Sequence, residues 1–254
     1  MSNPILEIQK LSKFFGRVVA ALNINLTFEP GVLTSIIGPN GAGKSTLINM
    51  LSGSLSPDSG RIVFEGREIT HLPVHRRVQL GLCRSFQVVN VFPQLSAFDN
   101  VQIPVLAMQN RARRFLRPVA GEESVHREVE DILDRIGLGG EKSHATASAL
   151  SHGDQRVLEV GIALAARPRI LFLDEPTAGM NPVERVRILE NIKTLSKEGR
   201  TTFVIVEHDM DIVFSLSERI IVLHHGVVIG DGTTEEIKSN PKVREVYLGE
   251  EVSE

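Results

Sequence analysis

The sequence predicts an α/β fold built on a mainly parallel β-sheet, and three observations support this prediction. Four short apolar runs rich in β-branched residues have the composition of strands that are buried on both faces. A helical pattern over residues 183–196 separates two of these runs, and such alternation is typical of parallel sheets. A glycine-rich loop joins the earliest run to a segment free of Gly and Pro. The four strands are expected at residues 32–37, 170–173, 202–206 and 219–223.

The composition limits the classes of protein to consider. With 254 residues, of which 42% are hydrophobic, the chain can form one large domain with an inserted part. The 28 basic and 31 acidic residues give a net charge of -3, so charge does not favour nucleic acid as a partner. The single cysteine, Cys83, excludes an internal disulfide. A lone cysteine also fits a reducing cytoplasm. No secretory signal and no run of about 18 apolar residues is visible, so any work at a membrane is expected to go through partners.

The N-terminal part, residues 1–87, is expected to hold an antiparallel β-subdomain and the beginning of the core. Apolar residues alternate over residues 5–30, a pattern of antiparallel strands around a turn at Gly16. A further strand is expected at residues 61–64, between two turn-forming segments, and a short one around residues 82–86.

Residues 88–160 have a different, mainly helical character. Apolar residues recur at helical spacing over residues 122–136, and glycines follow this segment. A second helix is expected from about Gly153 to Ala166, before Pro168. The remaining residues, 161–254, return to buried strands and are expected to complete the core and add a C-terminal tail.

The strongest motif lies between the first buried strand and the helix that is expected at residues 44–51. It fits the pattern G-x-x-x-x-G-K-[ST] of phosphate-binding loops, in the strand–loop–helix context that the motif requires. Glycines allow successive N–H groups to surround an anion, and the helix N-terminus adds its positive end. A chance glycine-rich turn is a poor alternative, because both flanks are correct. The residues are Gly38, Pro39, Asn40, Gly41, Ala42, Gly43, Lys44, Ser45 and Thr46.

Two acids follow the buried strand at residues 170–173. Asp174 stands where a strand end can hold Mg²⁺, and Glu175 can accept a proton from an attacking water. In isolation, such a pair is more often a solvated loop. After a phosphate-binding loop in the same chain, the sequence favours a site for a nucleoside triphosphate and Mg²⁺.

Leu150, Ser151 and Gly153 form a further pattern, Leu-Ser-x-Gly, immediately before a predicted helix. Ser151 is a good N-cap, and its hydroxyl with the Gly153 backbone could bind a phosphate. As an isolated string this signal is weak, because serine caps many helices.

Taken in order, the motifs resemble the ATP-binding cassette (ABC) family over nearly the whole chain. The series is the phosphate loop, Gln87, Leu-Ser-x-Gly, Ile-Leu-Phe-Leu-Asp-Glu-Pro and His208. The resemblance implies a P-loop NTPase with a RecA-like core, an antiparallel β-subdomain and an inserted α-helical subdomain. It also implies ATP and Mg²⁺ as ligands, and a head-to-tail dimer that sandwiches each ATP.

The resemblance also implies a role for each site residue. Phe15 stacks on adenine, Glu175 is the catalytic base and His208 holds the γ-phosphate. Ser45, Gln87 and Asp174 serve the metal, and Gln87 also senses the water. The signature that acts on the partner's ATP comprises Ser151, His152, Gly153, Asp154 and Gln155.

Some residues depart from the usual ABC pattern. The signature reads Leu-Ser-His-Gly-Asp, and His152 lacks the backbone freedom of the usual glycine, so affinity at the partner site could differ. Residues 178–182 replace the usual D-loop, and Phe15 replaces the commoner tyrosine. These departures and the ending 247–251 resemble the ATPases of branched-chain amino-acid importers.

That narrower resemblance implies a peripheral subunit on the cytoplasmic face of the inner membrane. Its partners would be a second ABC ATPase, identical or homologous, and two membrane permease subunits, with an extracytoplasmic solute-binding protein delivering leucine, isoleucine or valine. The solute itself never needs to touch this chain, so its identity stays open.

Several alternatives remain at this point. A cassette for urea or amide uptake, or for lipopolysaccharide export, is the nearest. A non-transport ABC ATPase generally carries two cassettes or long coiled coils, which are not seen here. A P-loop kinase or GTPase does not need Leu-Ser-x-Gly, and no guanine-selecting Asn-Lys-x-Asp occurs. The basic run 111–117 is interpreted as a solvated helix face rather than a contact with lipid, a membrane partner or nucleic acid.

Overall fold

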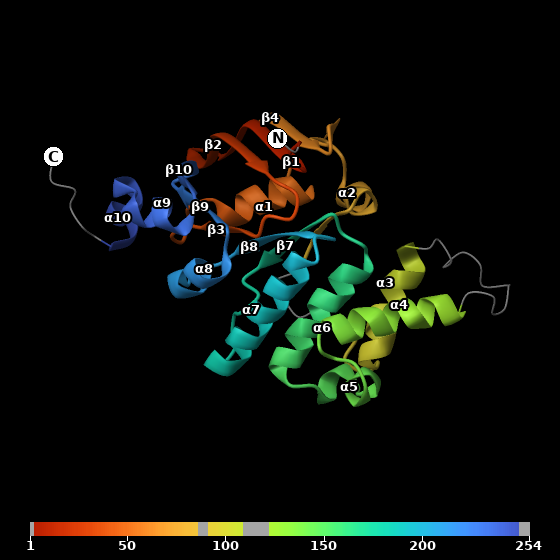
Figure 1. Ribbon diagram of the computed structural model, residues 1–254. Helices are drawn as coiled ribbons and strands as arrows, with labels where there is room; N and C mark the ends of the chain where they lie inside the picture. Colours follow the sequence, from red (N-terminus) through yellow and green to blue (C-terminus); the bar gives the residue numbers. More distant parts are fainter. Residues whose placement is uncertain (1–2, 86–90, 109–121, 249–254) are drawn as a thin grey trace.

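The computed structural model describes residues 3–85, 91–108 and 122–248 and confirms the α/β fold (Figure 1). Two sheets are surrounded by helices. Along the chain the elements are β1 (Leu6–Phe15), β2 (Val18–Phe28), β3 (Thr34–Ile37), α1 (Lys44–Ser52), β4 (Ser59–Phe64), β5 (Arg67–Glu68), α2 (Val74–Leu80), β6 (Leu82–Arg84), α3 (Ala97–Met108), α4 (Glu122–Arg135), α5 (Glu141–His144), η2 (Ala147–Ala149), α6 (His152–Ala165), β7 (Ile170–Asp174), α7 (Pro182–Lys197), β8 (Thr202–Val206), α8 (Met210–Leu216), β9 (Arg219–His224), β10 (Val227–Gly232), α9 (Thr234–Ser239) and α10 (Pro241–Leu248).

The larger sheet is the predicted parallel sheet. Its strand order is β10-β9-β3-β8-β7-β6, and the pairs from β9 through β6 are parallel. Only β10 joins it antiparallel, beside β9. Because β3, β7 and β8 run the same way, their C-terminal ends meet at one edge of the sheet. Ile36 and Asp174 both pair with Val206 at that edge.

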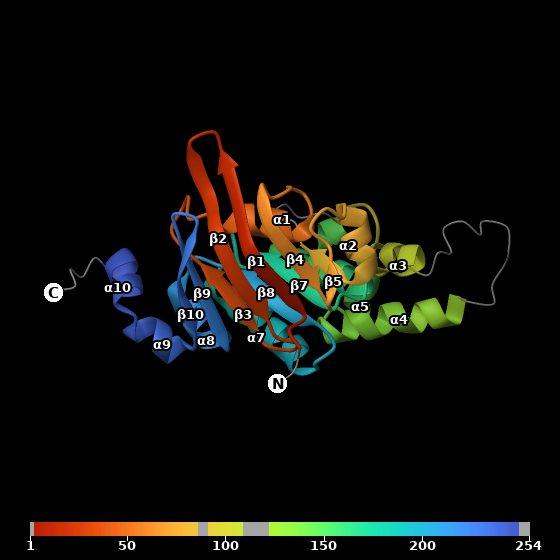
Figure 2. The ribbon, with the colours of Figure 1, turned by 90° about the horizontal axis from the view of Figure 1, so that it is seen from above.

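The smaller sheet is antiparallel, with the order β2-β1-β4-β5. Its first two strands form the hairpin predicted around Gly16, which has a φ of 59°. Seen from above, the tip of this hairpin extends beyond the rest of the molecule (Figure 2). The sheet lies over α1, which separates it from the parallel sheet (Figure 1).

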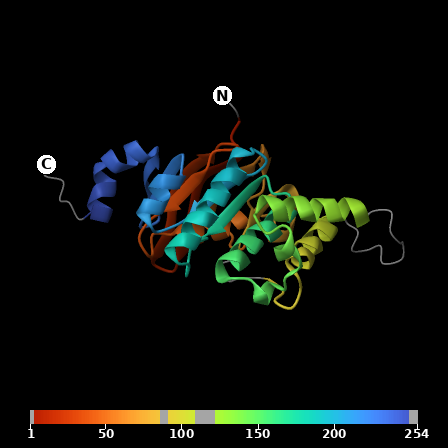
Figure 3. The ribbon, with the colours of Figure 1, turned by 60° about the horizontal axis from the view of Figure 1, so that its bottom comes forward.

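The alternation of side chains along the buried strands divides the core into two layers. On β7, Ile170 and Phe172 pack with α1 and the antiparallel sheet, whereas Leu171 and Leu173 pack on the opposite side. The second layer includes residues of α7 and also of the helical part α3–α6. Figure 3 shows α7 crossing beneath the sheet, with the helical part beside it. One apolar cluster therefore joins the helical part to the core.

Several boundaries and elements differ from the predictions. Helix α6 begins at His152, one residue before the expected start, and it continues through residue 160, where the helical part was expected to end. Strand β6 ends at Arg84, and the rest of the expected strand 82–86 includes Phe86, which lies outside the described residues. Elements β5, α2, α3, α5, η2, α8, β10, α9 and α10 were not predicted. Most of these elements are short, and α3 contains Pro104, so neither period nor composition revealed them.

A buried arginine holds the C-terminal end of α1. Arg77 is 1% exposed, and its guanidinium donates hydrogen bonds to the carbonyls of Met50, Leu51, Leu72 and Thr70 at 2.7–2.9 Å. Burial lowers the pKa of Arg77 to about 10. The positive charge satisfies carbonyls that the end of a helix leaves without partners.

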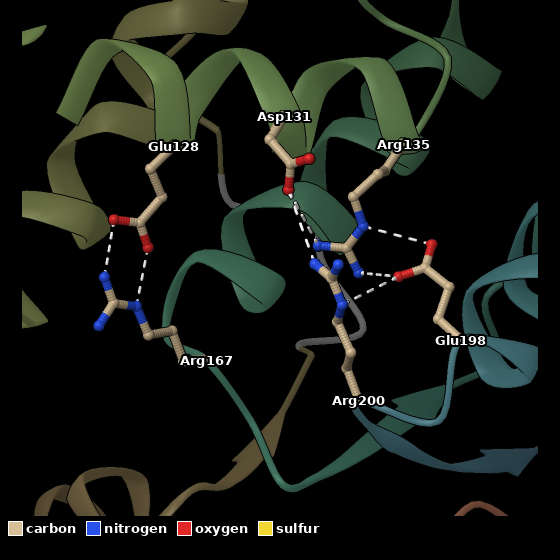
Figure 4. A network of polar contacts seen from close by, with 6 residues as sticks. All are labelled: Glu128, Asp131, Arg135, Arg167, Glu198 and Arg200. Atoms are coloured by element: carbon tan, nitrogen blue, oxygen red, sulfur yellow. Dashed lines mark hydrogen bonds and ion pairs between the residues drawn. The ribbon is translucent and has the colours of Figure 1, made fainter. Parts of the chain in front are cut away.

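Ion pairs on the surface connect α4 with neighbouring segments (Figure 4). Arg135 of α4 lies 2.7 Å from Glu198, which follows α7, and Arg167 makes two hydrogen bonds of 2.7 Å with Glu128. Asp131 and Arg200 complete the group, with N–O distances of 3.7–3.9 Å. Exposed pairs of this kind each contribute at most about 1 kcal/mol. They supplement the apolar cluster in joining the helical part to the core.

Candidate functional site

The phosphate-binding loop has the predicted placement between β3 and α1. Gly38 to Gly43 form the loop, and Lys44, Ser45 and Thr46 form the first turn of α1. Asn40, Gly41 and Ser45 are exposed, whereas Gly38 and Ala42 are buried. The loop therefore offers exposed backbone and an exposed hydroxyl at a helix N-terminus, the arrangement that binds phosphate.

Two glycines of the loop are required by close packing. A Cβ atom on Gly38 would lie 2.3 Å from the carbonyl oxygen of Leu223, and one on Gly43 would lie 2.2 Å from the carbonyl oxygen of Ala20. Gly43 also has a φ of 101°, which other residues rarely adopt. The N–H of Gly226, in the turn after β9, donates to the carbonyl of Ala42 at 2.9 Å. Neighbouring backbone thus supports the loop from behind.

Lys44 is held within the loop. Its ammonium donates to the carbonyl oxygens of Gly38 and Pro39 at 2.6 and 3.1 Å. Burial lowers the pKa of Lys44, while the negative charges of Glu175 and Asp174 act in the opposite direction. The lysine therefore lies in the electrostatic field of both predicted carboxylates.

The two acids end strand β7 as predicted, and they have different surroundings. The Asp174 side chain is 2% exposed, and its Oδ2 accepts a hydrogen bond of 2.6 Å from Arg84. Glu175 has a φ of 46°, and its N–H donates to the carbonyl of Val206. This left-handed backbone turns the chain away from the strand direction. The carboxylates of Asp174 and Glu175 therefore point in different directions although the two residues are adjacent.

His208 follows β8 at the same edge of the sheet. Its Nδ1 lies 3.8 Å from Oε1 of Glu175, and the imidazole is 65% exposed. The structure therefore brings together Lys44, Asp174, Glu175 and His208, which lie far apart in the sequence. Gln87 lies outside the described residues, and its assigned role stays a prediction.

Sequence reasoning missed two charged residues of this edge, Arg84 and Glu207. Glu207 is buried and accepts a hydrogen bond of 2.7 Å from the hydroxyl of Thr177, which fixes the turn after Glu175. Burial raises the pKa of Glu207, although its hydrogen bonds with Thr177 partly offset this. The sequence did contain a signal for both residues, because Arg84 ends strand β6 and Glu207 directly follows strand β8.

The signature residues form the N-terminus of α6. Ser151 is the N-cap as predicted, and its hydroxyl accepts a hydrogen bond from the N–H of Asp154 at 3.1 Å. Gln155 donates through Nε2 to the carbonyl of Leu150. His152 begins the helix and is not among the residues with positive φ. This conformation therefore does not require a glycine at position 152.

The signature packs against the segment that follows the turn after Glu175. A Cβ atom on Gly179 would lie 3.6 Å from Nε2 of His152, and one on Gly153 would lie 3.1 Å from the side chain of Glu184. Asp154 accepts hydrogen bonds from Lys142 of α5 at 2.8 Å and from Arg187 of α7 at 2.9 Å. Three helices are therefore tied together at the signature.

The signature and the phosphate loop of the same chain have separate polar partners in the described residues. In the described part of the chain, no hydrogen bond or ion pair joins residues 151–155 to residues 38–46. Each region has exposed residues, Ser151 and His152 on one side and Ser45 on the other. This separation agrees with a site that two chains would complete, which stays a prediction.

Phe15 lies at the end of β1, in the projecting hairpin. Its ring is 50% exposed, and the ammonium of Lys13 lies 5.6 Å from the ring centroid. Lys13 is itself held by Asp58, with an N–O distance of 2.8 Å. An exposed aromatic face is available for stacking, but no contact described here tests its assignment to adenine.

The residues present fit a nucleoside triphosphate with Mg²⁺. The loop is a cradle that added side chains would fill, and its lysine supplies a positive charge for phosphate oxygens. Ser45 and Asp174 supply the hydroxyl and carboxylate oxygens that Mg²⁺ prefers. Together with the parallel sheet, this site defines a P-loop nucleoside triphosphatase.

Comparison with known proteins narrows this class. The family model of the ABC transporter matches residues 21–178, and that of the branched-chain amino acid ATP-binding cassette transporter matches residues 227–253. The chain belongs to the ABC transporter family, whose ATP-binding domain hydrolyses ATP.

Among curated relatives, the high-affinity branched-chain amino acid transport ATP-binding protein BraF of Pseudomonas aeruginosa is 38% identical over 255 residues, which cover 98% of this chain and 100% of BraF. LivG of Escherichia coli, which is also described as a high-affinity branched-chain amino acid transport ATP-binding protein, is 37% identical, and the match covers 98% of this chain and 100% of LivG. A solved ATP-binding cassette of an ABC transporter in its ADP conformation has a TM-score of 0.83 and 32% identity, covering 98% of this chain and 100% of that one.

We expect Lys44→Ala to reduce ATP binding at least about tenfold, because it removes the positive charge that faces the phosphates. Equilibrium binding of a fluorescent ATP analogue would measure the loss. The matched control is Lys242→Ala, which removes an exposed lysine of α10 and should leave the affinity unchanged. Equal affinities for Lys44→Ala and wild type would contradict the assignment of Lys44.

The ion pairs at the signature predict a pH-dependent contribution to stability. Burial raises the pKa of Asp154, but hydrogen bonds and charge from Lys142 and Arg187 outweigh it and hold the pKa below the usual value. This stabilisation is therefore complete above the unfolded-state pKa, about 4, and is lost as the pH falls through the lower folded-state value.

Asp154→Asn should accordingly lower the free energy of unfolding by about 1–2 kcal/mol at neutral pH. The difference from wild type should shrink below about pH 4. Urea unfolding across this pH range would measure it, with Asp211→Asn, at an exposed residue of α8, as the control. A difference that does not change with pH would show that the charge of Asp154 is not responsible.

Proposed function

We propose that this chain is the ATP-hydrolysing subunit of an importer of branched-chain amino acids. The observation that carries the proposal is full-length similarity to BraF and LivG, at 38% and 37% identity. The match of residues 227–253 to the branched-chain family model supports it, because this region lies outside the general cassette match at 21–178.

The described residues suit the chemistry of phosphoryl transfer to water. Lys44 and the loop hold the phosphates, so the chain positions the substrate and stabilises its negative charge. Glu175 accepts the proton of the attacking water, and His208, 3.8 Å from Glu175, orients the transferring group and the base. Mg²⁺, when bound at Ser45 and Asp174 with Gln87, supplies positive charge to the phosphate oxygens.

The assembly that we propose contains two cassettes, head to tail, each supplying its signature to the other's ATP. A dimeric bacterial ABC transporter cassette with a TM-score of 0.73 and 26% identity, covering 90% of this chain and 98% of that one, supports the pairing of two cassettes, and the head-to-tail order is part of the proposal. Two membrane permease subunits would form the passage, and an extracytoplasmic binding protein would deliver the solute.

In the described part of this chain, none of the helices is long and apolar enough to cross a bilayer. Because the relatives are named as ATP-binding proteins of transport systems, we place the subunit on the cytoplasmic face of the inner membrane.

One observation favours a second candidate function. The lipopolysaccharide export system ATP-binding protein LptB of Acidithiobacillus ferridurans is 35% identical over 247 residues, covering 97% of this chain and 98% of LptB. The identities are close, so the solute has to be tested directly.

The direct test is ATP turnover by the chain with its membrane partners in liposomes. We expect leucine, isoleucine or valine, presented with the binding protein, to stimulate ATP hydrolysis and to accumulate inside the vesicles. Stimulation by lipopolysaccharide and none by these amino acids would overturn the branched-chain assignment and leave the ATPase assignment intact.

Glu175→Gln should retain ATP binding but reduce hydrolysis by about 100-fold or more, because the amide cannot accept the proton of water. ATP-bound dimers should accumulate, and sedimentation with ATP would detect them. Glu190→Gln, at an exposed residue of α7, is the control and should hydrolyse ATP at the wild-type rate. Near-normal hydrolysis by Glu175→Gln would remove this residue from the role of base.

A further inference from the structure

Arg84, at the end of strand β6, connects strand β7 with helix α1. Its Nη2 lies 2.6 Å from Oδ2 of Asp174, and its Nη1 lies 2.5 Å from Oδ1 of Asn49. The side chains of Arg84 and Asp174 are only 16% and 2% exposed. The guanidinium therefore lies between the carboxylate of strand β7 and helix α1, which begins with Lys44.

The backbone fixes where this arginine begins. Arg84 is the last residue of β6, where it pairs with Phe172 of β7, and the next N–H, that of Ser85, donates to the carbonyl of Phe172 at 2.8 Å. Asn49 in turn lies on α1, five positions after Lys44. Both ends of the Arg84 side chain are thus attached to regular elements, so the guanidinium has a defined place.

A guanidinium in such a place controls the orientation of its carboxylate. Hydrogen bonds between charged groups are short and strong, and the planar guanidinium fixes the direction of each donor. Among the described residues, Arg84 is the only one that forms an ion pair with Asp174, so without it the buried carboxylate would lose this partner. A buried carboxylate in that situation rotates or recruits water.

We propose that Arg84 is a positioning residue for Asp174 in the binding of the divalent cation that accompanies the nucleotide. By holding Oδ2, it leaves Oδ1 as the oxygen that serves the cation, and Asn49 holds Arg84 in turn. The inference rests on the proposed function, because it concerns the same Mg²⁺–nucleotide site. It assigns no contact between Arg84 and the nucleotide.

The proposal predicts a defect that depends on the metal. In Arg84→Met, the Mg²⁺ concentration for half-maximal ATP binding should rise about tenfold or more, the usual effect of losing a group that orients a metal ligand. Binding of ATP in excess EDTA should stay unchanged, since Lys44 and the loop carry it. Arg84→Lys should restore part of the metal affinity, because one donor and the charge remain.

Two further variants separate positioning from general stability. Asn49→Leu removes the group that holds Arg84 but leaves the ion pair, so it should shift the Mg²⁺ dependence in the same direction by a smaller factor. Arg61→Met breaks an exposed pair with Glu68 on β4 and β5 and should change nothing. Thermal unfolding of each variant reports folding, and Arg84→Lys and Asn49→Leu carry the test if Arg84→Met does not fold.

Equal Mg²⁺ dependence in wild type, Arg84→Met and Asn49→Leu would overturn the proposal. So would a loss of ATP affinity that is the same in EDTA and in Mg²⁺, because this would mean that Arg84 only supports the fold. A wild-type chain that binds no ATP would instead contradict the proposed function, so the two failures are distinguishable.

Discussion

The close contact of backbone with backbone behind the phosphate loop is the constraint on which the rest of the structure depends. Gly38 lies against the carbonyl of Leu223 in the parallel sheet, and Gly43 against that of Ala20 in the antiparallel sheet. Each contact leaves no room for a side chain. The loop is therefore one of the places where the two sheets approach each other, and a Cβ atom at either glycine would collide with backbone.

The direction of the parallel strands then decides which residues share the site. Because β3, β7 and β8 end at one edge, Lys44, Asp174, Glu175 and His208 meet there. The alternation along β7 directs its apolar residues to two different clusters, and the charged residues come only at the strand end. Strand β7 thus keeps charge out of its apolar stretch and carries it at the end where the ligand is proposed to bind.

The signature belongs to a different part of the molecule. Asp154 ties α6 to α5 and α7, and the apolar cluster continues from these helices into the sheet. Helix α7 is therefore connected to the signature through Arg187, and its N-cap, Asn181, follows the turn after Glu175.

The sequence by itself determined the elements whose signals are local. The phosphate loop, the buried strands and the Ser151 cap could be predicted because each depends on neighbouring residues, such as glycines at fixed spacing or a hydroxyl before a helix. Only the tertiary structure decided that Arg84 pairs with Asp174, ninety positions away, and that Gly43 faces Ala20. Contacts of this kind depend on the order of the strands in the sheet. That order results from the simultaneous burial of many apolar side chains, so it cannot be predicted from any short segment of the sequence.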